Sequence, residues 1–288
     1  MNVYIQSVLL GIVEGLTEFL PVSSTAHLRI AEALMKISLD DEYWKMYSIV
    51  IQAGAILALL LLYLSRIVGF LRTFPEGENG DRNWLTHPLS LTFLAFAFTS
   101  APALLLKKWS DRNLGSLTVI ALALLIGGVV MWAVDAWYSH QDATTTHVEE
   151  MGVGQSIWIG LCQALSAIFP GVSRSMSTIA AGQIAGLDRP SALEFSFLLS
   201  IPTMLAATGY DLLKEIHPGS THAAAHVVMT TDRWAVLAIG FIVSFIVALG
   251  VVEWFLVWVR RHGFAIFAFY RILLGIALLV FGSHFISG

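Results

Sequence analysis

Six apolar segments, each about as long as a membrane-crossing helix, constrain this chain more than any other feature. A helix needs about 20 apolar residues to cross a hydrocarbon core of about 30 Å. Of the 288 residues, 57% are hydrophobic and 12% are charged, against roughly 25% charged residues in soluble domains. We therefore predict an all-α polytopic membrane protein with six spans, at residues 46–64, 89–106, 116–138, 191–213, 235–258 and 265–286.

Charge and cysteine content exclude several classes of protein. The net charge is −4, so the chain has no basic excess with which to hold nucleic-acid phosphates. Its single cysteine, Cys162, cannot form an intrachain disulfide, and no Cys/His cluster has the spacing of a zinc site. Nucleic acid, structural zinc and disulfide chemistry are not expected.

Two further apolar stretches, 3–35 and 153–187, are too long for one span and are interrupted near the middle. The interruptions are Pro21-Val-Ser-Ser-Thr and Pro170-Gly-Val-Ser-Arg-Ser. Non-helical backbone is tolerated in a membrane only where protein buries it or where it lines a polar cavity. Each stretch is therefore predicted to be a re-entrant helical hairpin, and we expect six spans plus two hairpins.

The two interrupted stretches resemble each other. Residues 6–21 and 155–170 match without gaps at an offset of 149, which pairs Gln6 with Gln155, Gly11 with Gly160 and Pro21 with Pro170. In this register Glu14 meets Gln163, and Ser24 meets Ser173. Chance similarity of two apolar helices is the alternative. The match favours one integral membrane domain of two repeats, 1–140 and 150–288. Three crossings per repeat would invert the second relative to the first.

Ionisable residues at membrane depth are costly and mark functional sites by default. Glu14 and Glu18 are four residues apart, which places both carboxylates on one face of the first hairpin helix. Two such carboxylates oppose each other's ionisation unless a cation lies between them. They are candidate ligands of a divalent cation, Mg²⁺ or Ca²⁺. The alternative is a proton-sharing or interfacial pair of glutamates.

Hydroxyl side chains open the helix that follows the first interruption. Ser23, Ser24 and Thr25 suit either N-capping or the binding of a phosphate at a helix N-terminus. His27 follows Ser24 by three residues, on the same helical face, where the two side chains can come within hydrogen-bond reach for general-base or nucleophilic catalysis.

The second interruption places Arg174 at the tip of its hairpin. A guanidinium there would be costly unless it is paired with a carboxylate of the protein or binds a phosphate in a bidentate manner. Both tips together would hold two helix N-termini, an arginine, a Ser/His pair and two carboxylates, which suits the cleavage of a phosphoanhydride. The candidate substrate-binding residues are Ser23, Thr25, Ser173, Ser175, Thr178 and Gln52, although Gln52 also fits close helix packing.

Other functions fit the same architecture. Inverted repeats with interrupted helices are typical of secondary transporters, so a transporter or polyprenyl-phosphate flippase is the alternative to an enzyme, and a phospholipid-binding scaffold is a third interpretation. Basic residues do not orient the chain, because seven lie on the predicted N-terminal face and six on the other.

The motifs resemble those of the undecaprenyl-diphosphate phosphatases, also called bacitracin-resistance proteins. The matching strings are Glu14 to Thr25 followed by His27, Pro170 to Ser175, Glu194 to Leu199, and Phe269-Tyr270-Arg271, so the likeness covers essentially the whole chain. The family usually has glycine where this chain has Ala26 and Met176. The second departure puts a long side chain at a tip where backbone normally approaches closely.

The resemblance implies a phosphatase of the bacterial inner membrane that removes the terminal phosphate of a C55 isoprenoid diphosphate, with a site on the periplasmic side. Such an enzyme recycles the lipid carrier for cell-wall synthesis and confers bacitracin resistance. It further implies a metal-supporting pair in Glu14 and Glu18, a nucleophile in Ser24, a catalytic His27 and a phosphate-binding Arg174. The implied partners are the polyprenyl diphosphate and membrane lipids, and the chain is compatible with a homodimer.

Overall fold

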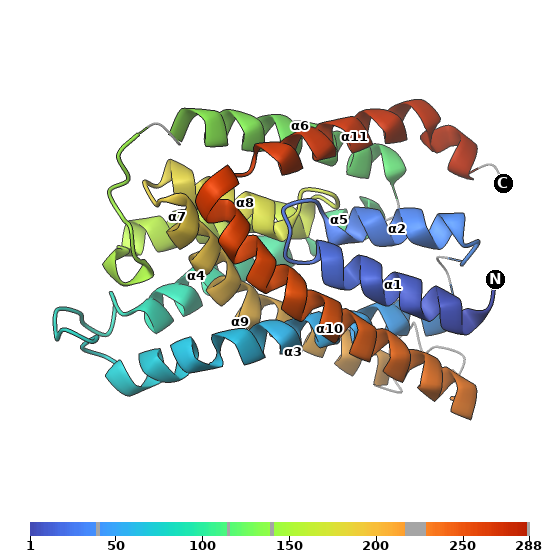
Figure 1. The fold of residues 1–288 in the computed structure, drawn as a ribbon, viewed down its shortest axis with the longest axis horizontal. Coiled ribbons are helices and arrows are strands. Elements are labelled where there is room, and N and C mark those ends of the chain that lie inside the picture. Colours follow the sequence, from blue (N-terminus) through green and yellow to red (C-terminus); the bar gives the residue numbers. More distant parts are fainter. Residues whose placement is uncertain (39–40, 114–115, 139–140, 217–228, 287–288) are drawn as a thin grey trace.

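The computed structural model describes residues 1–38, 41–113, 116–138, 141–216 and 229–286. All of its regular elements within these ranges are helices (Figure 1). They are α1 (Val3–Thr17), α2 (Ser24–Leu34), α3 (Glu42–Thr73), α4 (Pro88–Leu105), α5 (Lys107–Asn113), α6 (Leu117–Tyr138), the 3-10 turn η1 (Val148–Glu150), α7 (Val153–Ile168), α8 (Arg174–Ile184), α9 (Arg189–Ile216), α10 (Thr231–His262) and α11 (Ala265–Ile286).

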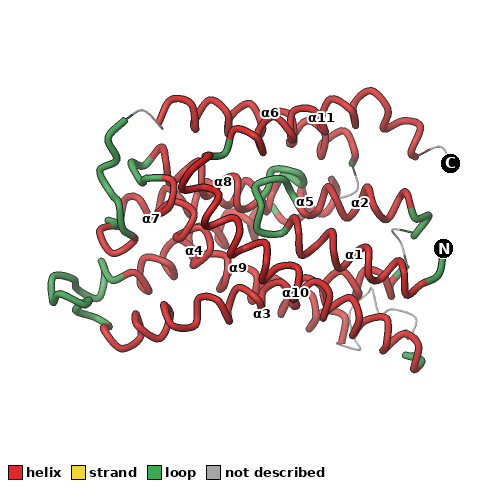
Figure 2. Tube along the Cα trace, viewed as in Figure 1, coloured by secondary structure: helices red, strands yellow, loops and turns green. Residues whose placement is uncertain are grey.

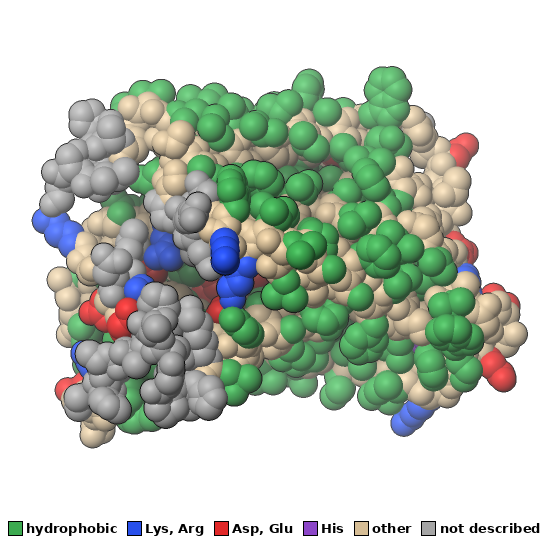
Figure 3. All heavy atoms as spheres, turned by 180° about the vertical axis from the view of Figure 1, so that it is seen from behind, with side chains coloured by type: hydrophobic (Ala, Val, Ile, Leu, Met, Phe, Trp, Pro, Cys, Tyr) green, Lys and Arg blue, Asp and Glu red, His purple; other side chains and the backbone are tan. Residues whose placement is uncertain are grey.

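The six predicted spans are confirmed. Within the described residues, six helices are long and apolar enough to cross a membrane: α3, α4, α6, α9, α10 and α11. Figure 3 shows hydrophobic side chains over most of one face, while the charged side chains gather toward its two ends. This distribution is that of a multi-pass membrane protein, in which the lipid-facing surface is apolar. The short helix α5 was not predicted.

The two interrupted stretches form helix–break–helix hairpins, α1 with α2 and α7 with α8. Figure 2 shows the loop between α1 and α2 in the middle of the helix bundle, whereas the longer connections lie at its ends. Each second helix begins after a serine with a positive φ, 74° at Ser23 and 72° at Ser173. Each of these serines accepts an N–H from the first helical turn, that of Ala26 or Met176.

The shared backbone geometry corrects one part of the predicted register. Ser23 and Ser173 are both N-caps, so Ser173 corresponds to Ser23 rather than to Ser24, and Ser24 corresponds to Arg174. The offset therefore changes from 149 in the first helices to 150 in the second. The ungapped match could not show this, because the second break has one more residue between its proline and its N-cap serine, Gly171 and Val172 against Val22 alone.

Helix packing follows a related pattern in the two halves. Helix α1 packs along α10, and α7 packs along α4. Ser7 donates to the carbonyl of Val236 at 2.7 Å, and Ser156 donates to that of Leu91 at 2.6 Å. Such matched contacts agree with a duplication, although the inverted repeat itself stays a prediction. Its proposed limits at 140 and 288 fall outside the described residues.

Gly160 allows the backbones of α7 and α4 to come into close contact. A Cβ added to Gly160 would lie 2.8 Å from the Cα of Ala95 and against its carbonyl oxygen, and both atoms belong to backbone that cannot easily move. Gly154, on the same helix, has no atom within 4 Å of an added Cβ.

We predict that Gly160→Ala separates α7 from α4 and lowers the free energy of unfolding by about 1–3 kcal/mol, the usual cost of overpacking. Gly154→Ala is the matched control, and it should be neutral or slightly stabilising because alanine favours helix. Thermal unfolding of both variants in detergent measures the difference. Equal melting temperatures would contradict this account of the packing.

Candidate active site

A buried arginine from α11 joins the two hairpin breaks. The Arg271 side chain is fully buried, and its guanidinium donates to the carbonyl of Pro21 in the first break and to those of Gly171 and Val172 in the second, at 3.2, 3.1 and 2.9 Å. It also donates to Ala123 on α6 at 3.2 Å. Carbonyl groups at a helix interruption lack helical partners, so this one buried side chain satisfies several of them.

The second break also comes very close to α6. Gly171 has a φ of 96°, and an added Cβ would lie 2.7 Å from the carbonyl oxygen of Ile120. Only glycine combines this backbone conformation with so close an approach. The Pro-Gly sequence thus allows Arg271 to reach both breaks.

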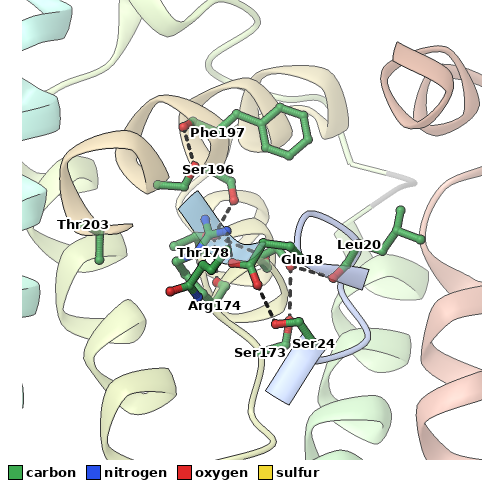
Figure 4. A network of polar contacts seen from close by, with 12 residues as sticks. Glu18, Leu20, Ser24, Ser173, Arg174, Thr178, Ser196, Phe197 and Thr203 are labelled. Carbon is green, nitrogen blue, oxygen red and sulfur yellow. Dashed lines mark hydrogen bonds and ion pairs between the residues drawn. The ribbon is translucent and has the colours of Figure 1, made fainter. Parts of the chain in front are cut away.

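The tips of the two hairpins meet at one carboxylate, that of Glu18 (Figure 4). Ser24 Oγ donates to Glu18 Oε2 at 2.5 Å, and Arg174 Nη2 donates to Glu18 Oε1 at 3.2 Å. Ser175 adds a second link between the tips, since its hydroxyl donates to the carbonyl of Leu20 at 2.9 Å. The structure therefore brings together three of the predicted catalytic residues from two distant parts of the sequence.

The Arg174 guanidinium still has one nitrogen that can donate to a ligand. It forms an ion pair with Glu18, and both side chains are largely buried. Its Nη1 atom is buried and has no hydrogen-bond partner. A buried unpaired guanidinium nitrogen is costly, and a bound anion would satisfy it.

Glu14 lies one turn before Glu18 on α1, as predicted. Its side chain is 1% exposed, and neither carboxylate oxygen has a hydrogen-bond partner. The corresponding Gln163 of the second hairpin donates instead to Thr99 and Thr203. A carboxylate buried without donors is costly unless it is protonated or binds a cation.

The predicted contact between Ser24 and His27 is wrong. His27 Nδ1 lies 2.7 Å from the carbonyl oxygen of Ser23, and Nε2 lies 2.6 Å from the hydroxyl of Tyr270 on α11. Ser24 turns to Glu18 instead. The helical spacing does place both residues on one face, but hydrogen-bond partners outside α2 draw the two side chains apart.

The remaining hydroxyls of the second tip serve mainly to hold α8. Ser173 caps the helix and contacts the hydroxyl of Ser175 at 3.1 Å. Thr178 contacts Ser196 on α9 at 2.6 Å. Of the predicted substrate-binding residues in this hairpin, Ser175 makes the direct link to the first tip.

Among the described residues, no hydrogen bond joins two predicted substrate-binding residues, Thr25 and Gln52, to Glu18, Ser24 or Arg174. Thr25 is exposed on α2, and Gln52 on α3 accepts a hydrogen bond from Thr208 on α9 at 3.1 Å. The contact of Gln52 supports its alternative interpretation, in which it packs helices together.

The two residues that differ from the family pattern, Ala26 and Met176, both pack against α6. Ala26 is fully buried in a cluster with Ile120 and Leu124. The side chain of Met176 points toward Gly127, where an added Cβ would lie 2.7 Å from the Met176 Cε atom. Met176 thus fills space beside α6 rather than the space around Glu18.

Two apolar cavities flank the hairpins. One, of about 630 Å³, lies between α1, α2, α10 and α11 and has His27, Thr17 and Tyr270 among its lining residues. The other, of about 520 Å³, lies between α5, α6, α7 and α8 and includes Met176. We call the first the His27 groove. It is the larger of the two.

Arg271 and Tyr270 were not predicted to belong to the site. The sequence singles out both residues only through the string Phe269-Tyr270-Arg271, and it gives no sign that the Arg271 guanidinium donates to carbonyl oxygens of the two breaks. A signal existed, because an arginine within an apolar span without a carboxylate nearby in sequence needs partners from elsewhere.

Comparison with known proteins identifies the family. The chain matches the family described as Bacitracin resistance protein BacA over residues 7–277. It belongs to that family. It is 59% identical over 281 residues to a protein of Koribacter versatilis (strain Ellin345) named Undecaprenyl-diphosphatase, with 97% of this chain and 98% of the relative covered. Relatives of the same name from Caldanaerobacter subterraneus and Bradyrhizobium sp. (strain ORS 278) are 39% and 41% identical, with 97% and 96% of this chain and 96% of each relative covered.

The meeting of the tips can be tested by crosslinking. Ser24 and Arg174 both contact Glu18, so cysteines at 24 and 173 in a Cys162→Ser background should be joined within one chain by a short crosslinker. Each single-cysteine variant is the control. We expect Arg271→Met to reduce the yield, because the two breaks then lose their common donor. Failure of the paired cysteines to crosslink would show that the tips are apart.

Proposed function

We propose that this chain hydrolyses undecaprenyl diphosphate to undecaprenyl phosphate and inorganic phosphate. The observation that carries the proposal is the convergence of a serine and an arginine from two hairpins on the Glu18 carboxylate, at membrane depth. The names of the relatives support the same reaction. A phosphatase needs a nucleophile, a base and charge neutralisation for the transferred phosphoryl group, and these three residues supply them.

Ser24 is the proposed nucleophile and Glu18 its base. The Ser24 hydroxyl already donates to Glu18, so its proton passes to that carboxylate as Oγ attacks the terminal phosphorus. The bond from this phosphorus to the bridging oxygen breaks, and undecaprenyl phosphate leaves. Water then hydrolyses the phosphoserine and releases inorganic phosphate, which restores Ser24.

Arg174 is proposed to hold the phosphoryl oxygens. Its unpaired Nη1 provides a donor, and Nη2 can exchange Glu18 for a phosphate oxygen. The first turns of α2 and α8 add backbone N–H groups at the same place. Such preorganised donors stabilise the charge of the transition state in a site from which water is largely excluded.

Glu14 and Glu18 fit the divalent cation that the family resemblance implies. The orphaned, buried Glu14 carboxylate needs a cation or a proton. Among the described residues no group of three or more His, Cys, Asp or Glu side chains is placed to hold a metal. The protein would thus supply two carboxylates, and phosphate oxygens and water the rest, as is usual for Mg²⁺. When bound, the ion would neutralise phosphate charge.

The His27 groove is the proposed place of the prenyl chain. It is apolar along most of its length and has His27 and Tyr270 among its lining residues, so a lipid lying in it would bring its polar head toward the hairpin tips.

We place the enzyme in the bacterial inner membrane with the site open to the periplasm, where it would recycle the carrier lipid for cell-wall synthesis and confer bacitracin resistance. A homodimer stays a prediction.

A polyprenyl-phosphate flippase is the second candidate, because interrupted helices in related halves suit alternating access. It predicts lipid movement across liposomes without phosphate release. The two functions are separated by one assay, the release of inorganic phosphate from undecaprenyl diphosphate by the purified chain in detergent.

We predict that wild type releases phosphate and that Ser24→Ala, Glu18→Gln and Arg174→Ala each lower kcat by at least about 10²-fold, the order of losing one oxyanion donor. Arg174→Lys should recover only part of this loss, since lysine lacks the bidentate geometry. The double variant Glu18→Gln/Ser24→Ala should have a kcat little lower than that of either single variant, because residues that act as one catalytic unit are not additive. Thr25→Ala, measured in the same assay, tests whether Thr25, which is exposed on the same helix, binds substrate as predicted. A wild-type protein without detectable hydrolysis would contradict the enzyme assignment.

Metal dependence gives a separate prediction. EDTA should abolish phosphate release, and Mg²⁺ or Ca²⁺ should restore it, because Glu14 and Glu18 then regain their counter-ion. Glu14→Gln should weaken the restoration by raising the metal concentration needed for half-maximal activity. Full activity after thorough chelation would rule out the metal role.

A further inference from the structure

We propose that Tyr270 is a positioning residue for His27, and that it holds the Nε2 atom of that imidazole toward the His27 groove, where the water that attacks the phosphoserine would give up its proton. The inference rests on the proposed function for its consequence in turnover. Its structural part concerns a protonation state that can be measured without any substrate.

The two contacts of His27 determine which ring nitrogen carries the proton. Nδ1 lies 2.7 Å from the carbonyl oxygen of Ser23, and a carbonyl can only accept. Nδ1 is therefore the donor. In the neutral imidazole Nε2 is then an acceptor, and the Tyr270 hydroxyl, 2.6 Å away, donates to it.

Ring stacking fixes the plane of the imidazole. The rings of His27 and Tyr270 are stacked with centroids 5.5 Å apart and an interplanar angle of 15°. The tyrosine therefore constrains His27 twice, through its hydroxyl and through its ring. Two constraints from a neighbouring span orient a side chain more firmly than α2 alone could.

The lone pair held in this way faces the groove rather than the nucleophile. His27 and Tyr270 both line the His27 groove, whereas Ser24 donates to Glu18. His27 is thus unavailable as the base for Ser24 in this arrangement. It becomes available to a water that enters from the groove and replaces the Tyr270 hydroxyl at Nε2. Nε2 would then accept the proton of that water as it attacks the phosphoserine.

Helix α11 organises the site through two consecutive residues. Arg271 reaches the carbonyls of both breaks, and Tyr270 reaches the imidazole of α2. Any displacement of α11 would therefore change the junction of the tips and the orientation of His27 together.

Kinetics provide the first test. Tyr270→Phe removes the hydroxyl and keeps the ring, and we expect it to lower kcat by about 10-fold, a part of what general-base catalysis usually supplies, while KM changes little. In a His27→Ala background the same substitution should have almost no further effect. Tyr4→Phe is the control, since it removes a tyrosine hydroxyl that binds Asp232 instead. A kcat loss of equal size in the His27→Ala background would show a merely structural role and overturn the proposal.

Nitrogen NMR provides the second test. In protein labelled with 15N-histidine, the His27 signals, assigned by their absence in His27→Gln, should show a protonated Nδ1 and a hydrogen-bonded, unprotonated Nε2. In Tyr270→Phe the Nε2 signal should move toward that of a free imine nitrogen. A proton on Nε2 in the wild type, or an unchanged Nε2 signal in the variant, would overturn the inference. Inactive wild-type protein with the expected NMR signals would contradict only the proposed function.

Discussion

The hydrogen bonds of Arg271 to the carbonyls of both hairpin breaks hold the rest of the site in place. An interrupted helix leaves backbone groups without partners, and no water is present in the bilayer core to satisfy them. One fully buried guanidinium serves the first break at Pro21 and the second at Gly171 and Val172. This one side chain therefore links the two interruptions to each other. Their pairing creates the place where Glu18, Ser24 and Arg174 meet.

The two hairpins share a backbone plan but carry different chemistry. Both have an N-cap serine with a positive φ, and both pack a first helix against a span of the other half. At corresponding positions the first hairpin has Glu14 and the second has Gln163, and the first has Ser24 where the second has Arg174. A carboxylate and the proposed nucleophile thus come from one hairpin, and the guanidinium comes from the other. The predicted duplication, followed by divergence, would explain why the site needs both.

The sequence predicts the larger features well for a simple reason. Apolar length sets the six spans, and proline with small polar residues marks the two breaks, both of which depend on local sequence. Ionisable residues at membrane depth are rare enough that Glu14, Glu18 and Arg174 stand out.

The hydrogen-bond partners of the site residues, by contrast, depend on tertiary contacts that the sequence does not show. Spacing along α2 suggests a Ser24–His27 contact, yet Glu18 and Tyr270 provide stronger partners from outside that helix. The one-residue change in register is equally invisible to an ungapped match.

In the proposed mechanism, Glu18 activates Ser24 while His27 faces the His27 groove. The most direct measurement is to quench the enzyme with acid during turnover of undecaprenyl diphosphate and to locate the phosphoryl group by mass spectrometry. Phosphoserine survives acid and phosphohistidine does not, so the account predicts a phosphorylated peptide that contains Ser24, and its absence in Glu18→Gln. A phosphoryl group found only after alkaline quenching, on His27, would contradict the account.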